Sequence, residues 1–380
     1  MDLSLTGEQK LIRDSAKKLA ESVLLPRAAK ADKEGIFPIE QMKALADAGF
    51  LGMLAPEAYG GTGVGAMAYS LAMTEMARCC ASTAVTMAVT NMVGDAIAAW
   101  GDEAQKQRWI PPLVAGDLVS GSFALSEPGA GSDAASLKAT AIKKGDKYIL
   151  SGTKCWITSG DKSGVILVMA KTNVAAGARG ISCFLVDPKM KGFSIGAHEK
   201  KMGIRGSSTV TLLFDDVEVP EENRLGPEGV GFKIAMRALD GGRIGIGSQA
   251  VGIMLACLEA STKYALDRAQ FGKPLGDFQA IQWKLADMAT SLDAARLLTL
   301  RAAWLKDAGL PFATEASMAK VFASEVANQA ALEAIQIHGG YGYTDEFPVE
   351  RYLRDVRVST IYEGTSEIQR FVIARNILTA

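Results

Sequence analysis

The sequence predicts an α+β protein in three parts: an N-terminal all-helical domain, a middle antiparallel β domain and a C-terminal four-helix bundle. Apolar residues recur at helical spacing at the start of the chain and again after Pro220. Between these stretches lie short runs of β-branched and aromatic residues, separated by turn signals. Because 380 residues exceed one ordinary core, we expect domains at residues 1–118, 119–228 and 229–380.

The N-terminal domain is expected to begin with a capped helix. Thr6 and Gln9 have capping-box spacing, and Pro26 is expected to end this helix. Its buried face would carry Ile12, Ala16, Leu19 and Val23. Further helices are expected at residues 40–48, 66–80, 82–100 and 103–113, interrupted mainly by a glycine-rich loop at residues 60–63.

The middle domain reads as a set of short strands. They are expected at residues 119–125, 139–142, 148–151, 165–170, 181–186 and 208–214. No periodic helices lie between them, so an antiparallel sheet is expected and a doubly wound one is not.

The C-terminal domain is expected to contain four long helices with short connections, which is typical of a bundle. Their predicted ranges are 230–269, 278–307, 312–337 and a terminal helix from Ser366. Ser366 and Gln369 have capping-box spacing, which places the start of the last helix.

Composition narrows the class of protein. The chain is 48% hydrophobic and 22% charged, with a net charge of −1, so it carries no charge signature for nucleic acid or an anionic membrane. Five cysteines without a secreted-scaffold spacing indicate reduced thiols. The N-terminus shows no signal peptide, and no apolar run approaches the length of a membrane span. A cytoplasmic location is expected, or the mitochondrial matrix for a processed mature chain.

Two motifs in the middle domain suggest ligand contact. Residues 129–134 match the G-x-G-x-x-G/A fingerprint, but a hairpin and not a helix is expected next, so we reject a dinucleotide-binding βαβ site. A tight loop of small residues can still present backbone N–H groups to a ligand. Trp156 and Thr158 place an indole and a hydroxyl at the end of a strand, where core packing is the plainer interpretation of the bare pattern.

The bundle carries further candidates. Asp240 and Arg243 are i,i+3 neighbours among four helical glycines, which indicate close approach of either a second helix or a ligand. The chain has two histidines, no zinc-ligand spacing and no P-loop, so no metal site is expected.

The stretch 359–370 is the strongest candidate for chemistry. Ile361 and Tyr362 deliver Glu363 into a turn, and Gly364 permits close backbone approach. A carboxylate would then lie beside free N–H groups at a helix start. By itself, an acid in this place usually complements the helix dipole.

Six segments in order resemble the acyl-CoA dehydrogenase family. They are the N-terminal Leu-Thr-x-Glu-Gln opening, Ala124–Asp133, Trp156-Ile157-Thr158, Arg268-x-x-Phe271-Gly272, Gly339-Gly340-x-Gly342-Tyr343 and Tyr362-Glu363-Gly364-Thr365. Residues 239–246 and the last motif resemble the short-chain, butyryl-CoA type most. The resemblance implies the acyl-CoA dehydrogenase fold for the three expected domains.

The resemblance also implies a set of site residues. FAD would contact Phe123, Leu125, Ser126, Ser132, Trp156, Ile157, Thr158, Thr365 and Glu367. The FAD of a neighbouring subunit would contact Arg268, Phe271, Gln279, Gln336, Gly339 and Gly340, within a homotetramer. The acyl-CoA thioester would be lined by Ser132, Asp240, Arg243, Tyr362, Gly364 and Arg375.

The resemblance to this family implies that Glu363 is the catalytic base. A carboxylate in an apolar pocket has a raised pKa and can remove the weakly acidic α-proton while hydride passes to flavin N5. The Glu363 backbone N–H and the flavin ribityl hydroxyl would stabilise the thioester oxygen. A related subfamily carries its base at the position of Gly242, where glycine cannot act. Electrons would pass to electron-transferring flavoprotein.

Departures from the family pattern are small. Cys155 and Ser159 replace commoner residues, and residues 91–99, beside the expected acyl pocket, differ from the short-chain pattern. These departures leave the chain length and branching of the acyl group open. The resemblance to the short-chain type implies an acyl group that is short, or small and branched or cyclic. Two alternatives are a flavin oxidase or monooxygenase on the same scaffold, and a catalytically silent acyl-CoA-binding subunit.

Overall fold

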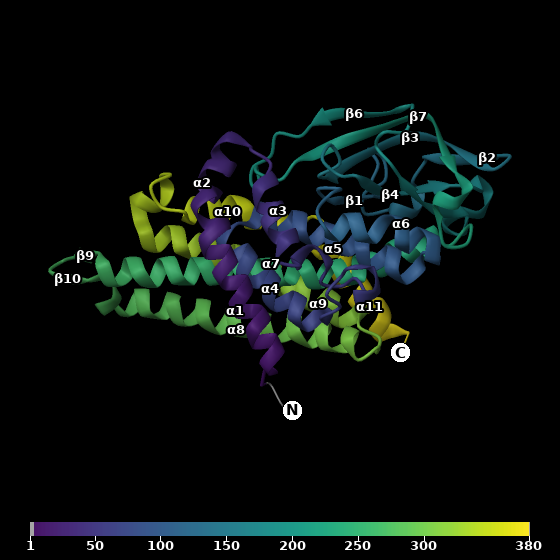
Figure 1. Ribbon diagram of the computed structural model, residues 1–380. Helices are drawn as coiled ribbons and strands as arrows, with labels where there is room; N and C mark the ends of the chain where they lie inside the picture. Colours follow the sequence, from purple (N-terminus) through teal and green to yellow (C-terminus); the bar gives the residue numbers. More distant parts are fainter. Residues whose placement is uncertain (1–3, 380) are drawn as a thin grey trace.

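Six helices of the N-terminal region lie along one side of the protein in the computed structural model, which describes residues 4–379 (Figure 1). Their bounds are α1 Gly7–Leu19, α2 Leu25–Glu34, α3 Ile39–Asp47, α4 Gly65–Cys79, α5 Ala81–Trp100 and α6 Glu103–Val114. Thr6 and Gln9 form the expected reciprocal capping box at α1. The prediction that there is no signal peptide rests partly on residues 1–3, which lie outside the described residues.

The expected end of the first helix at Pro26 is wrong. The helical path continues to Glu34 through a π-helical turn at Ala20–Leu24, and Pro26 occupies the first turn of α2. The wider turn restarts the hydrogen-bond pattern just before the proline, where its missing N–H removes no bond. Gly35, with φ 64°, ends α2 instead.

The middle region forms one twisted sheet above the helices (Figure 1). Its strands are β1 Gly121–Ala124, β2 Thr140–Lys144, β3 Lys147–Thr158, β4 Val165–Lys171, β5 Ile181–Val186, β6 Phe193–His198, β7 Thr209–Pro220 and β8 Arg224–Leu225. The order is β6-β7-β3-β2-β4-β5-β8, with β1 beside β4. The hairpin expected after residues 129–134 is present as β2–β3, and no helix of the dinucleotide-binding kind follows that loop.

The sheet departs from the antiparallel expectation in two places. β1 pairs with β4 in parallel, and β2 meets β4 in parallel through Thr140 and Lys171. Strand β6 was not expected, because its sequence has glycine and polar residues among few apolar ones. β3 and β7 are 12 residues each, longer than expected, since two bulges let β3 stay paired past Leu150 and Lys154.

The C-terminal region contains the four expected long helices and one more. They are α7 Gly231–Asp267, α8 Gln279–Asp307, α9 Ala313–His338, the unexpected α10 Val349–Arg357, and α11 Ser366–Leu378. A hairpin of β9 Ala269–Gln270 and β10 Lys273–Pro274 joins α7 to α8. The terminal helix begins at Ser366 as expected, but its cap is Thr365, whose hydroxyl accepts from the Ile368 N–H at 3.3 Å.

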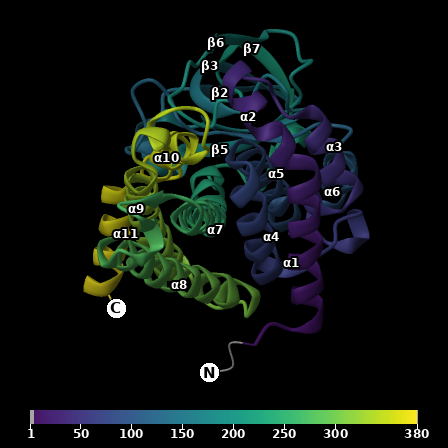
Figure 2. The ribbon, with the colours of Figure 1, turned by 90° about the vertical axis from the view of Figure 1, so that its left-hand side faces the viewer.

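Helix α7 passes through the middle of the protein. Figure 2 shows α4 and α5 on one side of it and α8 and α9 on the other. One 18-residue window of α7 has mean hydropathy 1.4, so the expectation that no apolar run approaches a membrane span is wrong for this helix by length and composition. That window is 78% buried inside the protein, as in the core helix of a globular fold. Within residues 4–379 no other helix passes that criterion.

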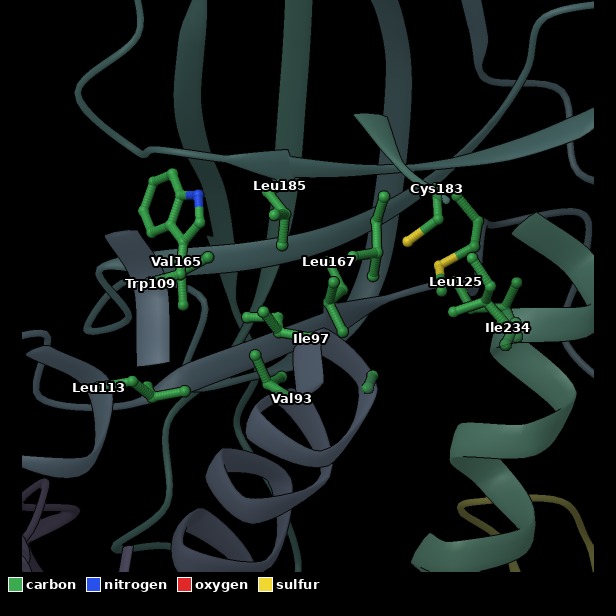
Figure 3. Packing of buried hydrophobic residues seen from close by; sticks show 14 of the residues in the cluster. Val93, Ile97, Trp109, Leu113, Leu125, Val165, Leu167, Cys183, Leu185 and Ile234 are labelled. Carbon is green, nitrogen blue, oxygen red and sulfur yellow. The ribbon is translucent and has the colours of Figure 1, made fainter. Parts of the chain in front are cut away.

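A hydrophobic cluster fastens the sheet to the helices beneath it (Figure 3). Val93 and Ile97 of α5 meet Leu167 and Leu185 of the sheet, and Ile234 at the start of α7 closes the cluster. Burial of an aliphatic side chain of this size contributes about 2 kcal/mol each. The β domain is therefore held firmly against α5 and α7, and the end of β3 is fixed relative to the bundle. The five cysteines are free and buried.

Candidate active site

Glu363 lies in a strained turn between a short 3₁₀ segment, Val358–Thr360, and α11. Its φ is 51°, unusual for a residue with a side chain, and Gly364 follows with φ 93°. Hydrogen bonds to its backbone carbonyls hold the turn in place. Gln369 Nε2 donates to Glu363 O at 3.2 Å and to Gly364 O at 2.9 Å. Lys320 Nζ of α9 donates to Gly364 O at 2.6 Å. These bonds offset the backbone strain and set the direction of the side chain.

The Glu363 carboxylate points into the protein. Oε2 is buried and accepts no hydrogen bond from residues 4–379. Burial raises the pKa of Glu363 to about 7, against the opposing positive charges of Lys320 and Arg243. The carboxylate does not complement the dipole of α11, because Thr365 caps that helix and Glu367 supplies the acid of its first turn. A buried acid without a partner is costly for stability, and such groups are common at functional sites.

Gly242 makes room for this carboxylate. A Cβ atom on Gly242 would stand 1.9 Å from Glu363 Oε2. The sequence left open whether the α7 glycines admit a helix or a ligand; at Gly242 the approaching group is a side chain of the protein itself. At Gly245 the close neighbour is the Tyr69 hydroxyl, 2.7 Å from such a Cβ.

Two buried cations flank the carboxylate. Burial lowers the pKa of Lys320 to about 8. Arg243 Nη1 donates to Asp240 Oδ1 at 2.7 Å and to Ser317 Oγ at 3.3 Å, while its Nε finds no acceptor in the described residues. Burial also lowers the pKa of Arg243 and raises that of Asp240. The Asp240–Arg243 pair therefore lies inside the site and is not a surface pair.

Tyr362 anchors the turn to α7. Its hydroxyl donates to Gln249 Oε1, and Gln249 Nε2 donates to Ala81 O at 3.0 Å at the start of α5. These bonds link the turn that carries Glu363 to α7 and α5. Within the part of the chain that the structure describes, the Glu363 backbone N–H has no acceptor, so it is free to donate to a ligand.

The residues expected to contact flavin in the β domain fall on two adjoining segments. Cys155 N–H donates to Ser126 O at 3.0 Å, which joins the turn after β1 to the end of β3. Trp156 has φ 62° and is 63% exposed, so its indole is presented outward. The side chains of Leu125 and Ile157 are buried in the cores, which leaves their backbones for contact. Phe123, Ser126 and Thr158 are half-buried, and Ser132 is exposed.

Thr365 and Glu367 lie at the start of α11, next to Glu363 in the chain. The six residues expected to contact the FAD of a neighbouring subunit lie at the opposite end of the molecule. Figure 1 shows the β9–β10 hairpin far from the sheet, at the other end of α7. Phe271 on this hairpin is 95% exposed. Arg268, Gly339 and Gly340 line one open hollow of about 480 Å³. Gln279 and Gln336 are exposed nearby in the chain but are not among its lining residues. One chain therefore does not bring these six residues to the β-domain segments.

The two other expected substrate residues follow Glu363 in the chain. Gly364 adjoins the carboxylate, whereas Arg375 is exposed on α11. Asn91, in the region that departs from the family pattern, is committed to the core: it accepts from Met53 N–H at 2.9 Å and donates to Phe50 O at 2.8 Å. Among residues 4–379 no group of three or more His, Cys, Asp or Glu could hold a metal ion.

Sequence reasoning missed three residues of the site: Lys320, Gln369 and Gln249. A signal for Lys320 was present, because it interrupts the buried face of α9, which is otherwise made of small residues such as Ala316, Ala319 and Ala323. A lysine on a buried stripe needs an acceptor. Gln369 was assigned to a capping box, which the structure replaces with bonds to the turn carbonyls.

Comparison with known proteins identifies the family. The acyl-CoA dehydrogenase N-terminal, middle and C-terminal domain models match residues 6–117, 122–217 and 229–378. The chain therefore belongs to the acyl-CoA dehydrogenase family, whose members are flavoproteins.

Relatives include the mitochondrial short-chain specific acyl-CoA dehydrogenase of Rattus norvegicus, 49% identical over 99% of this chain and 91% of that protein. Acryloyl-CoA reductase (NADH) of Anaerotignum propionicum is 46% identical over 100% of this chain and 96% of that protein. The structure of butyryl-CoA dehydrogenase from Megasphaera elsdenii matches with TM-score 0.97, 43% identity and full coverage of both chains. A structure described as electron transferring flavoprotein of Acidaminococcus fermentans matches with TM-score 0.98, 44% identity and full coverage of both chains.

Proposed function

We propose that this protein is an FAD-dependent acyl-CoA dehydrogenase that oxidises a short-chain, or small branched or cyclic, acyl-CoA thioester to the 2-enoyl-CoA. The observation that carries the proposal is the Glu363 carboxylate, whose buried Oε2 has no hydrogen-bond partner among residues 4–379 and whose pKa is raised to about 7. A base with that pKa is suited to proton removal near neutral pH. The relatives named for short-chain acyl-CoA and butyryl-CoA support the substrate class.

The residues present fit FAD. The exposed indole of Trp156 offers a flat apolar surface, and Thr158, two residues further on, adds a half-buried hydroxyl. Near Gly129 and Gly131, an added Cβ would meet nothing within 4 Å, so the backbone of this loop is open to a ligand. We propose that Phe123, Leu125, Ser126, Ser132, Trp156, Ile157, Thr158, Thr365 and Glu367 hold the cofactor. When bound, FAD accepts the hydride that leaves the substrate β-carbon.

In the proposed mechanism Glu363 takes the α-proton. Gly242 allows its carboxylate to lie against α7, and the carbonyl bonds from Lys320 and Gln369 fix the turn that carries it. The Glu363 backbone N–H would donate to the thioester oxygen, which gains negative charge as the α-proton leaves. A single donor of this kind typically contributes about 3 kcal/mol to transition-state stabilisation. Asp240, Arg243, Tyr362, Gly364, Ser132 and Arg375 are proposed to line the thioester and its CoA.

We further propose a homotetramer in which one subunit completes the cofactor site of another. The support is the exposure of Phe271 and the position of Arg268, Gln279, Gln336, Gly339 and Gly340 at the far end of the bundle. Phe271→Asp should weaken assembly, seen as a smaller mass in light scattering, whereas Leu11→Ala on exposed α1 should not. A Phe271→Asp protein of unchanged mass and FAD content would reject this arrangement.

The proposed electron acceptor is electron-transferring flavoprotein. The support is the structural neighbour described as electron transferring flavoprotein of Acidaminococcus fermentans. The proposed location is the cytoplasm, or the mitochondrial matrix for a processed mature chain. Acyl-CoA dependent reduction of an added electron-transferring flavoprotein, followed by its absorbance, tests the acceptor directly.

Glu363→Gln tests the base. The variant should retain yellow FAD but fail to bleach with any member of a panel of acyl-CoAs that reduce the wild type. Glu8→Gln, an exposed acid on α1 with no role in the proposed site, is the control and should still be reduced. Normal reduction of Glu363→Gln would defeat the assignment.

Two further experiments separate the alternatives. Fast reoxidation of the reduced flavin by air in stopped flow would indicate an oxidase or monooxygenase. A colourless protein that binds acyl-CoA would indicate a silent binding subunit.

A further inference from the structure

A buried ion pair lies behind the two β-domain segments assigned to the cofactor. Lys154 of β3 and Glu127, in the turn after β1, meet with Nζ and Oε1 2.8 Å apart. Their side chains are 0% and 7% exposed. Neither residue takes part in the proposed chemistry, so the pair needs another explanation.

The pair joins three pieces of backbone. Lys154 Nζ also donates to Leu125 O at 3.0 Å. The Glu127 carboxylate accepts from Lys138 N–H at 2.6 Å and from Ala139 N–H at 2.9 Å, where β2 begins. Every polar group of the pair is therefore used to fix the turn after β1 against β3.

The pair also flanks an irregular part of β3. The pairing of β3 with β7 shifts between Lys154 and Ile157, and Trp156 within this bulge has φ 62°. Lys154 anchors the chain before the bulge, and the pairing of Ile157 with Val210 anchors it after. A strained residue keeps its conformation only when its surroundings hold it on both sides. These two anchors lie on either side of Trp156, whose side chain is exposed.

Stability alone does not account for the pair. Desolvation of two charges is expensive, and an apolar pair of similar volume is often as stable. Burial lowers the pKa of Lys154, against the favourable charge of Glu127. Charge-assisted bonds do, however, fix geometry more tightly than apolar contacts.

We propose that Lys154 and Glu127 are positioning residues for the flavin. Their ion pair sets the separation between the backbone at Leu125–Ser126 and the Trp156–Thr158 end of β3, and thereby the fit of the cofactor between them. The inference rests on the proposed function, because it requires that the protein binds FAD.

The test compares Lys154→Met, Glu127→Gln and the double variant with Lys143→Met. Lys143 forms an exposed ion pair with Glu221 in the same domain, at 2.6 Å, and serves as the matched control. The dissociation constant of FAD is measured by titrating each apoprotein and following quenching of flavin fluorescence. The visible circular dichroism of bound flavin reports its environment, and thermal melting of the apoprotein reports the fold.

Lys154→Met and the double variant should bind FAD about tenfold more weakly or worse, the effect of losing one charge-assisted contact, with altered visible circular dichroism. Lys143→Met should stay within about twofold, as an exposed pair contributes little. A single substitution can leave an unpaired buried charge and so unfold the protein. In that case the double variant, which has neither charge, provides the test. FAD affinity within twofold of wild type and an unchanged dichroism spectrum in the double variant would overturn the proposal. Failure of the wild type itself to bind FAD would instead reject the proposed function, and the inference with it.

Discussion

The carboxylate of Glu363 rests against the backbone of Gly242, so that a Cβ on Gly242 would lie 1.9 Å from Oε2 and 2.8 Å from Cδ. Gly242→Ala should therefore force the carboxylate out of its position. Misplacement of a reacting group by 1 Å can cost about 10²-fold in rate, and we expect a loss of that order in flavin reduction with FAD still bound. Single-turnover reduction by the best acyl-CoA measures it.

Gly241→Ala is the matched control for that substitution. The added methyl would approach the flexible Lys306 Nζ at 3.3 Å, which can move aside. Near-normal reduction is expected. Equal losses in the two variants would mean that helix α7, and not the Glu363 contact, is sensitive to change.

The pKa of Glu363 predicts the pH dependence of the reaction. Burial raises this pKa to about 7, and the ionised form is the base. The value of kcat/KM should therefore rise with pH and level off above an inflection near 7. A profile already level between pH 5 and pH 9, with a full deuterium isotope effect at the α-carbon, would contradict this assignment.

The same group predicts a change in stability with pH. The pKa of Glu363 is raised from 4.5 to about 7 on folding. Between pH 4.5 and about pH 7 the unfolded chain therefore loses the proton of this carboxyl, while the folded chain retains it. Ionisation then favours unfolding, and stability falls as pH rises through this window by roughly 3 kcal/mol. Glu363→Gln should raise the melting temperature more at pH 8 than at pH 5. Asp355, whose pKa burial also raises to about 7, is present in both proteins and cancels. A difference in melting temperature that is constant with pH would refute the prediction.

Lys320 provides an independent test of the electrostatics. Its positive charge lowers the pKa of Glu363, and its Nζ bonds the Gly364 carbonyl. Lys320→Met should move the inflection of the pH–rate profile to higher pH. Lys284→Met, which breaks the ion pair with Glu333 between α8 and α9, is the control and should leave the inflection in place. A shift toward lower pH in Lys320→Met would show that the lysine acts on Glu363 in another way.

Periodicity was sufficient to predict the three regions and the long helices of the fold. It failed at Pro26, because the proline penalty can be absorbed by a π-turn that depends on packing and not on local residue type. It also gave Ser366 as the capping residue of α11, whereas the cap is Thr365, because both hydroxyls suit the position and only the turn geometry separates them. Strand β6 was missed because its pairing with β7, and not its composition, makes it a strand.

The sequence predicted the residues of the candidate site that the chemistry itself requires. It did not predict the residues that reach the site only through tertiary contacts. Glu363 and Trp156 stood out as types in a motif. The role of Gly242 as a platform, and of Lys320 and Gln369 as donors to the turn, arises from contacts between helices far apart in the chain. Sequence spacing gives no information on such contacts, except where a polar residue on a buried helix face indicates that it has a partner, as Lys320 does in α9.

Helix α7 belongs to both helical regions at once. Ser248 bonds Ser70 of α4 at 2.7 Å, and Gly252 lets the Thr74 carbonyl approach to 2.3 Å from where a Cβ would be. The three stretches that the sequence distinguishes therefore share one cooperative unit. Calorimetry should record a single melting transition for both helical regions, and a gene fragment that ends before α7 should yield an aggregating polypeptide, because its inner helices lose the surface against which they are matched.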